Sequence, residues 1–105
     1  MQRAHGLEDA RAALAAGASA LVSSPFAACH AGVNYYRALV AALRAEFPQA
    51  FTFTLCCGDD PAIAHDALRL GFSSIICETS ESMLAQLRAA AATVDAQVLA
   101  RYPNA

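Results

Sequence analysis

Four stretches of the chain carry hydrophobic residues at helical spacing. In the first, about residues 7–16, Leu7 and Leu14 share one face, and Gly17 stands where a left-handed C-cap ends a helix. The other three are about residues 32–47, 60–70 and from 79 or 80 onwards. Asp60-Pro61 is a strong helix start, because an N-cap acid precedes a proline at the first helical position. The pattern predicts four helices.

Strand patterns alternate with these helices. Residues 51–57 alternate phenylalanine, leucine and cysteine with threonine, which is the period-two pattern of a strand. Shorter apolar stretches at about 18–23, 74–77 and 96–100 follow the first, third and fourth helices. This order predicts an α/β fold with a parallel sheet of about four strands and right-handed crossover helices.

Two strand orders remain open at this point. The sequential order 1-2-3-4 would form a partial, half TIM-barrel-like sheet, and the order 2-1-3-4 would form a flavodoxin-like open sheet. Residues 1–105 are expected to form a single domain, because one core usually occupies about 100 to 150 residues and no linker or repeat divides the chain.

Composition excludes two classes of partner. The net charge is −2 and the arginines are scattered along the chain, so we expect no nucleic-acid partner. No apolar run approaches the roughly 20 residues that span a bilayer, so we expect no membrane partner. The N-terminus lacks the apolar core of a signal peptide, and the four cysteines are therefore expected to be thiols in the cytoplasm.

Motifs spread from residue 24 to residue 80 resemble those of a known family. They are Ser24-Pro25, Ala31-Gly32, Tyr35, Ala38-Leu39-Val40, Phe47-Pro48, Leu55-Cys56-Cys57-Gly58-Asp59 and Leu70-Gly71-Phe72-Ser73-Ser74-Ile75-Ile76-Cys77-Glu78-Thr79-Ser80. In this order and without a gap, they resemble the class II (metal-dependent) fructose- and tagatose-bisphosphate aldolases. The resemblance implies a fragment of a TIM barrel and favours the sequential strand order.

Two departures from the family pattern decide the expected chemistry. The family's proton-transfer Asp and zinc-ligand His correspond to Cys56 and Cys57, and its further ligands come from later strands. Only Ser24 matches a position resembling a substrate contact. Aldol cleavage needs an acid–base group and a Lewis acid, so we expect neither this activity nor a metal or other cofactor.

Strand ends carry the sites of strand–helix barrels, so they define the candidate ligand pocket. Its residues are Ser23, Ser24, Cys56, Cys57, Asp59 and Glu78. No metal site is expected, because adjacent cysteines point to opposite sides of a strand and paired Cys-x₂-Cys spacing is missing. No catalytic residue is assigned. A helix start at Pro61 would lower a nearby thiol pKa, but Asp59 and Asp60 would oppose a thiolate.

These observations favour a degenerate, non-catalytic aldolase-like domain that acts in assembly or in small-molecule or protein binding. The alternative is a small enzyme or a metal or redox protein that uses the strand-end cysteines. A homodimer or higher oligomer is expected, because sequential order leaves one sheet face without helices. The side chains expected to meet water there are those of Leu21, Phe53 or Thr54, Leu55, and Ile75 or Ile76, because the terminal segments offer little cover beyond one short helix and a polar tail at 101–105.

Overall fold

The computed structural model describes residues 1–103 as five strands and five helices. In chain order they are β1 (Gln2–Arg3), α1 (Leu7–Ala15), β2 (Ala20–Val22), α2 (Ala27–Ala31), α3 (Val33–Glu46), β3 (Thr52–Cys56), α4 (Pro61–Arg69), β4 (Ser74–Ile76), α5 (Glu81–Ala92) and β5 (Gln97–Leu99). The four predicted helices and four predicted strands are present. Two further elements, β1 and α2, lie in segments where the pattern predicted neither.

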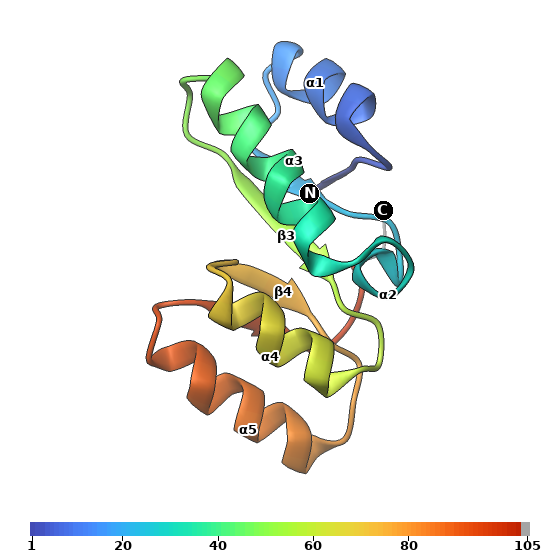
Figure 1. Cartoon of the computed structure of the whole chain (residues 1–105), viewed down its shortest axis with the longest axis vertical. Helices are drawn as coiled ribbons and strands as arrows, with labels where there is room; N and C mark the ends of the chain where they lie inside the picture. The colour runs from blue at the N-terminus through green and yellow to red at the C-terminus, as the bar shows by residue number, and fades with distance from the viewer. Residues whose placement is uncertain (104–105) are drawn as a thin grey trace.

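All five strands are parallel and lie in the order β1-β2-β3-β4-β5, so each strand pairs with its neighbours in the sequence (Figure 1). The sheet is therefore sequential, and the order 2-1-3-4 is not formed. The expected number of about four strands is one too few, because β1 adds an edge strand beside β2.

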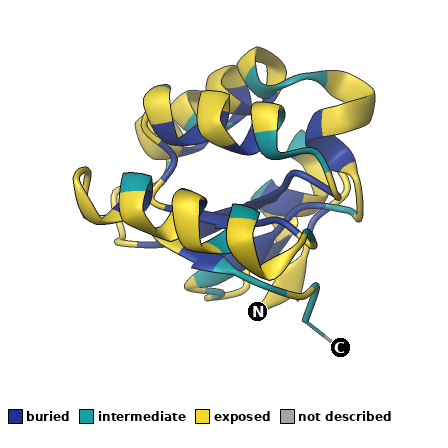
Figure 2. Ribbon diagram, turned by 90° about the horizontal axis from the view of Figure 1, so that it is seen from below, coloured by how far each residue is buried: buried dark blue, intermediate teal, exposed yellow. Residues whose placement is uncertain are grey.

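The helices pack on one face of the sheet, and the main core lies between the two layers. Leu21, Phe53, Leu55 and Ile75 project from the strands into this core and meet the inward side chains of the helices. Figure 2 shows the dark blue, buried parts of the helices turned inward and their yellow, exposed parts turned outward. Right-handed crossovers between sequential neighbours all step in one direction, which is why one face receives every helix.

The opposite face of the sheet is covered by the end of the chain. Val22, Cys56 and Ile76 form a second buried cluster, with Leu99 and Tyr102 packed against it. The expectation that this face would be bare and apolar is therefore wrong.

The side chains expected on that face have other positions. Leu21, Phe53, Leu55 and Ile75 lie on the helix side, and all of them are buried. Thr54 and Ile76 do belong to the face without helices, but they are 1% and 0% exposed. The polar tail covers more than expected because it carries Tyr102; Asn104 and Ala105 lie outside the described residues.

Local signals place the helix ends as predicted. The carboxylate of Asp60 accepts hydrogen bonds from the backbone N–H groups of Ala62 and Ile63, which satisfies two free donors of the first turn. Gly17 and Gly71 follow helices with φ of +98° and +100°, a region costly for other residues. No helix within residues 1–103 has the length and apolar character needed to cross a membrane.

Candidate site at the carboxyl ends of the strands

The parallel register brings the ends of β2, β3 and β4 to one edge of the sheet. The backbone N–H of Cys56 donates to Ser23 Oγ at 2.9 Å, which joins the ends of β2 and β3. The N–H of Glu78 donates to the carbonyl oxygen of Gly58 at 2.8 Å, which joins the segments after β3 and β4. The predicted site residues therefore share this edge.

These residues do not line one cavity. Cys57 belongs to the core on the helix side, whereas Cys56 belongs to the cluster on the other face. Ser23 is also fully buried, and Ser24 is half-buried. Asp59 and Glu78 are exposed. At this edge the carboxylates of Asp59 and Glu78 and part of Ser24 are accessible to solvent. The thiols of Cys56 and Cys57 are buried.

Helix α2, which the sequence pattern missed, adds Cys29 to this edge. Its thiol donates to the carbonyl oxygen of Cys57 at 3.3 Å, and it is the one exposed thiol of the four, none of which forms a disulfide within residues 1–103. Removal from water raises the pKa of Cys29 and of Cys57, and raises that of Cys77 to about 11. Nearby carboxylates raise these three pKa values further, which favours the protonated form of Cys29, Cys57 and Cys77.

The donor groups of this edge are not arranged around a common point. Across residues 1–103, no group of three or more His, Cys, Asp or Glu side chains is placed to hold a metal ion. Asp60 is already engaged as the cap of α4.

The open side of this edge is closed by Tyr102. Its ring packs against the Val22, Cys56 and Ile76 cluster, and its hydroxyl group donates to the carbonyl oxygen of Ser23. The guanidinium of Arg3 lies 5.1 Å from the centre of the ring, which is a cation–π distance. Tyr102 therefore covers Val22, Cys56 and Ile76 on the face without helices and is tied to the segment after β2.

A second polar pair at this edge was not found from the sequence. His5 follows β1, and its Nδ1 lies 2.6 Å from Ser24 Oγ at the end of β2. The side chain of His5 is exposed. The pairing depends on β1, a two-residue strand whose composition gives no recognisable signal.

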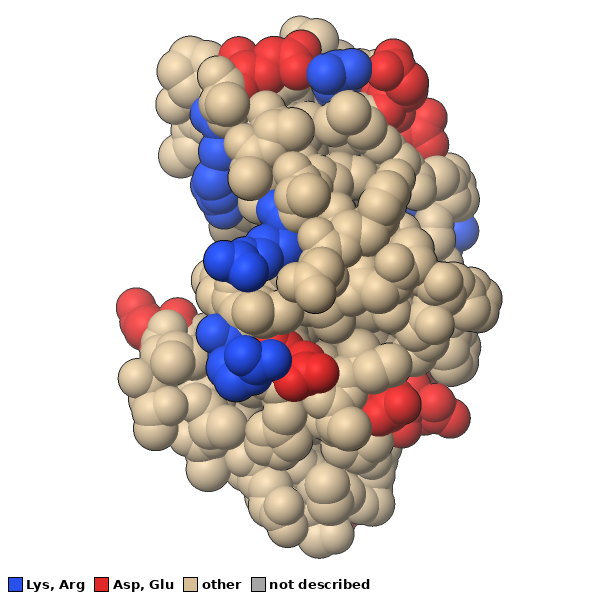
Figure 3. Space-filling view, in the orientation of Figure 1, with Lys and Arg blue, Asp and Glu red and all other residues tan. Residues whose placement is uncertain are grey.

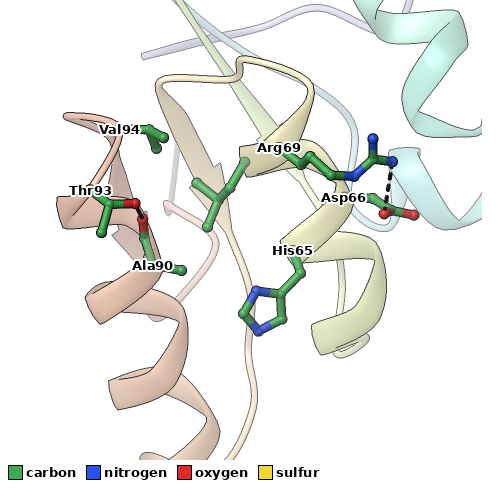
Figure 4. A pocket seen from close by; sticks show the side chains of 7 residues that line it. His65, Asp66, Arg69, Ala90, Thr93 and Val94 are labelled. Carbon is green, nitrogen blue, oxygen red and sulfur yellow. Dashed lines mark hydrogen bonds and ion pairs between the residues drawn. The ribbon is translucent and has the colours of Figure 1, made fainter.

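A hollow lies elsewhere, between α4 and α5. It has a volume of about 300 Å³ and is lined by His65, Asp66, Leu68, Arg69, Ala90, Thr93 and Val94. Figure 4 shows that Arg69 and Asp66 pair with each other, while His65 projects separately. These residues come from the later half of α4, from the last turn of α5 and from the segment just after α5, at the amino ends of the strands. In strand–helix folds that end usually serves stability rather than chemistry.

Charge is sparse on the face that carries the helices. Figure 3 shows most of the basic side chains on the left of the view, acidic ones at the top and lower right, an acidic group beside a basic one below the centre, and an uncharged surface over most of the remainder. Among residues 1–103, this face offers no broad basic surface of the kind that follows a phosphate backbone.

Comparison with family models, with curated proteins and with solved structures finds no match to this chain.

Proposed function

We propose that this chain is an α/β module that resembles a piece of a class II aldolase barrel, has lost aldol cleavage, and acts by binding or by assembly. Two features of the fold support the barrel comparison. The strands are parallel and sequential, and the helices lie on one face, as in a barrel wall. Ser24-Pro25 and Gly58-Asp59 follow adjacent strands, as the family motifs do.

One observation supports the loss of chemistry above all others. The positions that correspond to the proton-transfer Asp and the zinc-ligand His are Cys56 and Cys57, which are 1% and 0% exposed and lie on opposite faces of the sheet. A general acid or base must reach the substrate to exchange a proton with it. Neither thiol reaches the open edge of the sheet.

The residues present do not fit the zinc of the family. Cys56 and Cys57 project in opposite directions, and within residues 1–103 no third donor completes a metal group with either. Zinc in proteins takes at least three converging side chains. We therefore derive no catalytic step through a metal.

The alternative of a thiol enzyme is less well supported. A reactive cysteine is an accessible thiolate, whereas burial raises the pKa of Cys57 far above its ordinary value and that of Cys77 to about 11. Cys29 is accessible, but its pKa is raised as well. Four free thiols suit a reducing compartment, and the proposed location is the cytoplasm.

Binding and assembly predict different masses for the protein in solution. The reason given for a homo-oligomer, a bare apolar sheet face, no longer holds, since Leu99 and Tyr102 cover it. The oligomer itself stays a prediction. A sedimentation-equilibrium mass of at least twice the 10.9 kDa chain would favour assembly, and a mass of one chain would favour binding of a different molecule.

The loss of aldol cleavage is tested with fructose and tagatose 1,6-bisphosphates. The purified chain is incubated with each sugar and with Zn²⁺ or Co²⁺, beside a zinc-loaded class II aldolase, and triose phosphate is measured. We expect no release above the protein-free rate and no stoichiometric zinc after dialysis. Metal-dependent cleavage that follows the protein through purification would contradict the proposal.

A further inference from the structure

We propose that Ser24 and His5 form a nucleophile–base pair that reacts with activated acyl and phosphonyl esters at the carboxyl edge of the sheet. This chemistry is independent of the binding or assembly role, and the aldolase resemblance does not imply it. It rests on the contact between Ser24 Oγ and His5 Nδ1, which are 2.6 Å apart. That distance is within hydrogen-bond reach of a serine and its general base.

The register between β1 and β2 determines the relative positions of His5 and Ser24. Arg3 lies opposite Val22 in the parallel ladder, and the N–H of Ala4 donates to the carbonyl oxygen of Val22 at 2.9 Å. His5 and Ser24 each come two residues after this matched position. They therefore meet at the ends of neighbouring parallel strands, where sites of such sheets are usually found.

Both backbones are held in place. The carbonyl oxygen of Ser24 accepts from Ala27 N–H at 3.1 Å, and Pro25 restricts the backbone that follows. On the other side, the N–H of His5 donates to the carboxylate of Asp9 at 3.2 Å. The pair is thus preorganised, which lowers the cost of bringing nucleophile and base together.

The pair is also open to solvent. His5 is exposed and Ser24 is half-buried, whereas the neighbouring Ser23 is fully buried and its Oγ is engaged by the N–H of Cys56. Of the two serines that end β2, only Ser24 combines access to solvent with a contact to a base. Tyr102 covers the neighbouring cluster around Val22 and Cys56, and its hydroxyl group bonds to Ser23 rather than to Ser24.

The chemical step follows from the geometry. When the hydroxyl of Ser24 donates to His5 Nδ1, the neutral imidazole carries its proton on Nε2. As Ser24 Oγ bonds to an ester carbonyl carbon, its proton passes to Nδ1. The bond from carbon to the leaving oxygen then breaks, and the imidazolium returns the proton to the departing alcohol. Water hydrolyses the acyl-serine by the same route, with His5 again taking and returning the proton.

Charge around the pair limits the reaction to good leaving groups. Helix α1 begins two residues after His5, and Gly6 provides no side-chain cap, so N–H groups of the first turn face this edge. The same turn carries Glu8 and Asp9, whose charges oppose an oxyanion; Glu8 is partly neutralised by Arg11 at 2.9 Å. We therefore expect slow acylation, visible with activated reagents.

The test uses a fluorophosphonate probe on the whole chain, followed by peptide mapping. In this reaction the Ser24 Oγ–phosphorus bond forms, the phosphorus–fluorine bond breaks, and fluoride leaves as the serine proton passes to His5. We expect the label on the peptide that contains Ser24. Ser24→Ala should abolish it, and His5→Gln should slow it by about 10²-fold, at the lower end of general-base effects. Ser73→Ala, which removes another exposed serine, serves as the matched control and should leave labelling unchanged.

Mapping on the unmodified chain keeps the test decisive even if a variant folds poorly. Labelling of Ser73 or other serines at the same rate as Ser24 would overturn the proposed nucleophile–base pair. An unchanged rate of Ser24 labelling in a folded His5→Gln variant would overturn it as well. Hydrolysis of p-nitrophenyl acetate gives a second readout. A burst of nitrophenolate that both Ser24→Ala and His5→Gln remove supports the acyl-serine step, and a burst that persists in Ser24→Ala refutes it.

Discussion

The hydroxyl group of Tyr102 donates a hydrogen bond to the carbonyl oxygen of Ser23, although the two residues are 79 positions apart in the sequence. The contact ties the last described residues to the end of β2. It also holds the ring over Val22, Cys56 and Ile76, on the face that receives no helix. One aromatic side chain therefore covers the apolar part of a face that sequential topology leaves open.

Removal of this ring should uncover the cluster. We expect Tyr102→Ala to lower the free energy of unfolding by about 2 kcal/mol, since a half-buried aromatic ring is lost from an apolar contact. Tyr102→Phe keeps the ring and loses only the hydrogen bond, so about 1 kcal/mol is expected. Urea denaturation followed by circular dichroism measures both.

Tyr35 provides a control, because its side chain is 51% exposed on the outer surface of α3. Tyr35→Ala should cost clearly less than Tyr102→Ala. Equal costs would mean that Tyr102 does not cover the sheet in solution. Sedimentation of Tyr102→Ala is informative too, because an uncovered apolar face should favour self-association.

Most of the fold could be predicted because its signals are local. Helical periodicity, the Asp60-Pro61 start and the glycine after α1 each act within a few residues, and the structure confirms each of them. Tyr35 and Tyr36 are a further case. Adjacent helical positions cannot both face the core, and the structure buries Tyr36 while it exposes Tyr35.

The missed features depend on contacts that the sequence does not encode locally. Strand β1 has two residues, so no periodicity can be read from it, and without β1 the pairing of His5 with Ser24 is invisible. The position of Tyr102 depends on how the chain turns after β5. Leu21 and Leu55 were assigned to the wrong face of the sheet, because apolar residues such as Leu21 and Val22 are adjacent and their pattern does not say which one meets the helices.

Two glycines with positive φ should differ in their tolerance of alanine. A Cβ at Gly71 would meet no atom within 4 Å, so only the cost of φ +100° applies, and Gly71→Ala should lose about 1 kcal/mol. At Gly58 a Cβ would lie 2.4 Å from the ring of Phe26 and 3.2 Å from Cys29 Sγ. Gly58→Ala should therefore cost more.

A double-mutant cycle separates strain from steric overlap at Gly58. In the background of Phe26→Ala, the ring is gone and the cost of Gly58→Ala should fall towards that of Gly71→Ala. The same cost in both backgrounds would show that the ring moves away freely and that the backbone alone decides the effect.

The cap of α4 is a second local contribution to stability. Asp60 Oδ1 accepts from Ala62 N–H at 3.0 Å and from Ile63 N–H at 3.3 Å. Asp60→Ala should lower the free energy of unfolding by about 1 kcal/mol. The neighbouring Asp59 is exposed and does not cap α4, so Asp59→Ala is the matched control. A larger loss in the control would reverse the assignment of the cap.

The buried thiols predict how stability depends on pH. Burial raises the folded-state pKa of Cys77 to about 11 and raises that of Cys57 as well, above the value of a thiol in the unfolded chain. The unfolded chain therefore loses these protons first as the pH rises. The protonated thiols make their full contribution to stability at pH values below the thiol pKa of the unfolded chain. This contribution is lost as the pH rises towards the thiol pKa values of the folded protein.

We expect the urea concentration at the unfolding midpoint to decrease as the pH is raised from 7.5 to 10.5. Cys77→Ala removes one of these groups and should make the fall smaller, although it also lowers stability at pH 7.5 by leaving a small cavity. Comparison of the two proteins cancels the contribution of the tyrosines, which titrate in the same range. A fall of the same size in both would mean that Cys77 is as easily ionised in the folded protein as in the unfolded chain. Thiol counting with a disulfide reagent at pH 8 is the independent check, since only the exposed Cys29 should react before unfolding.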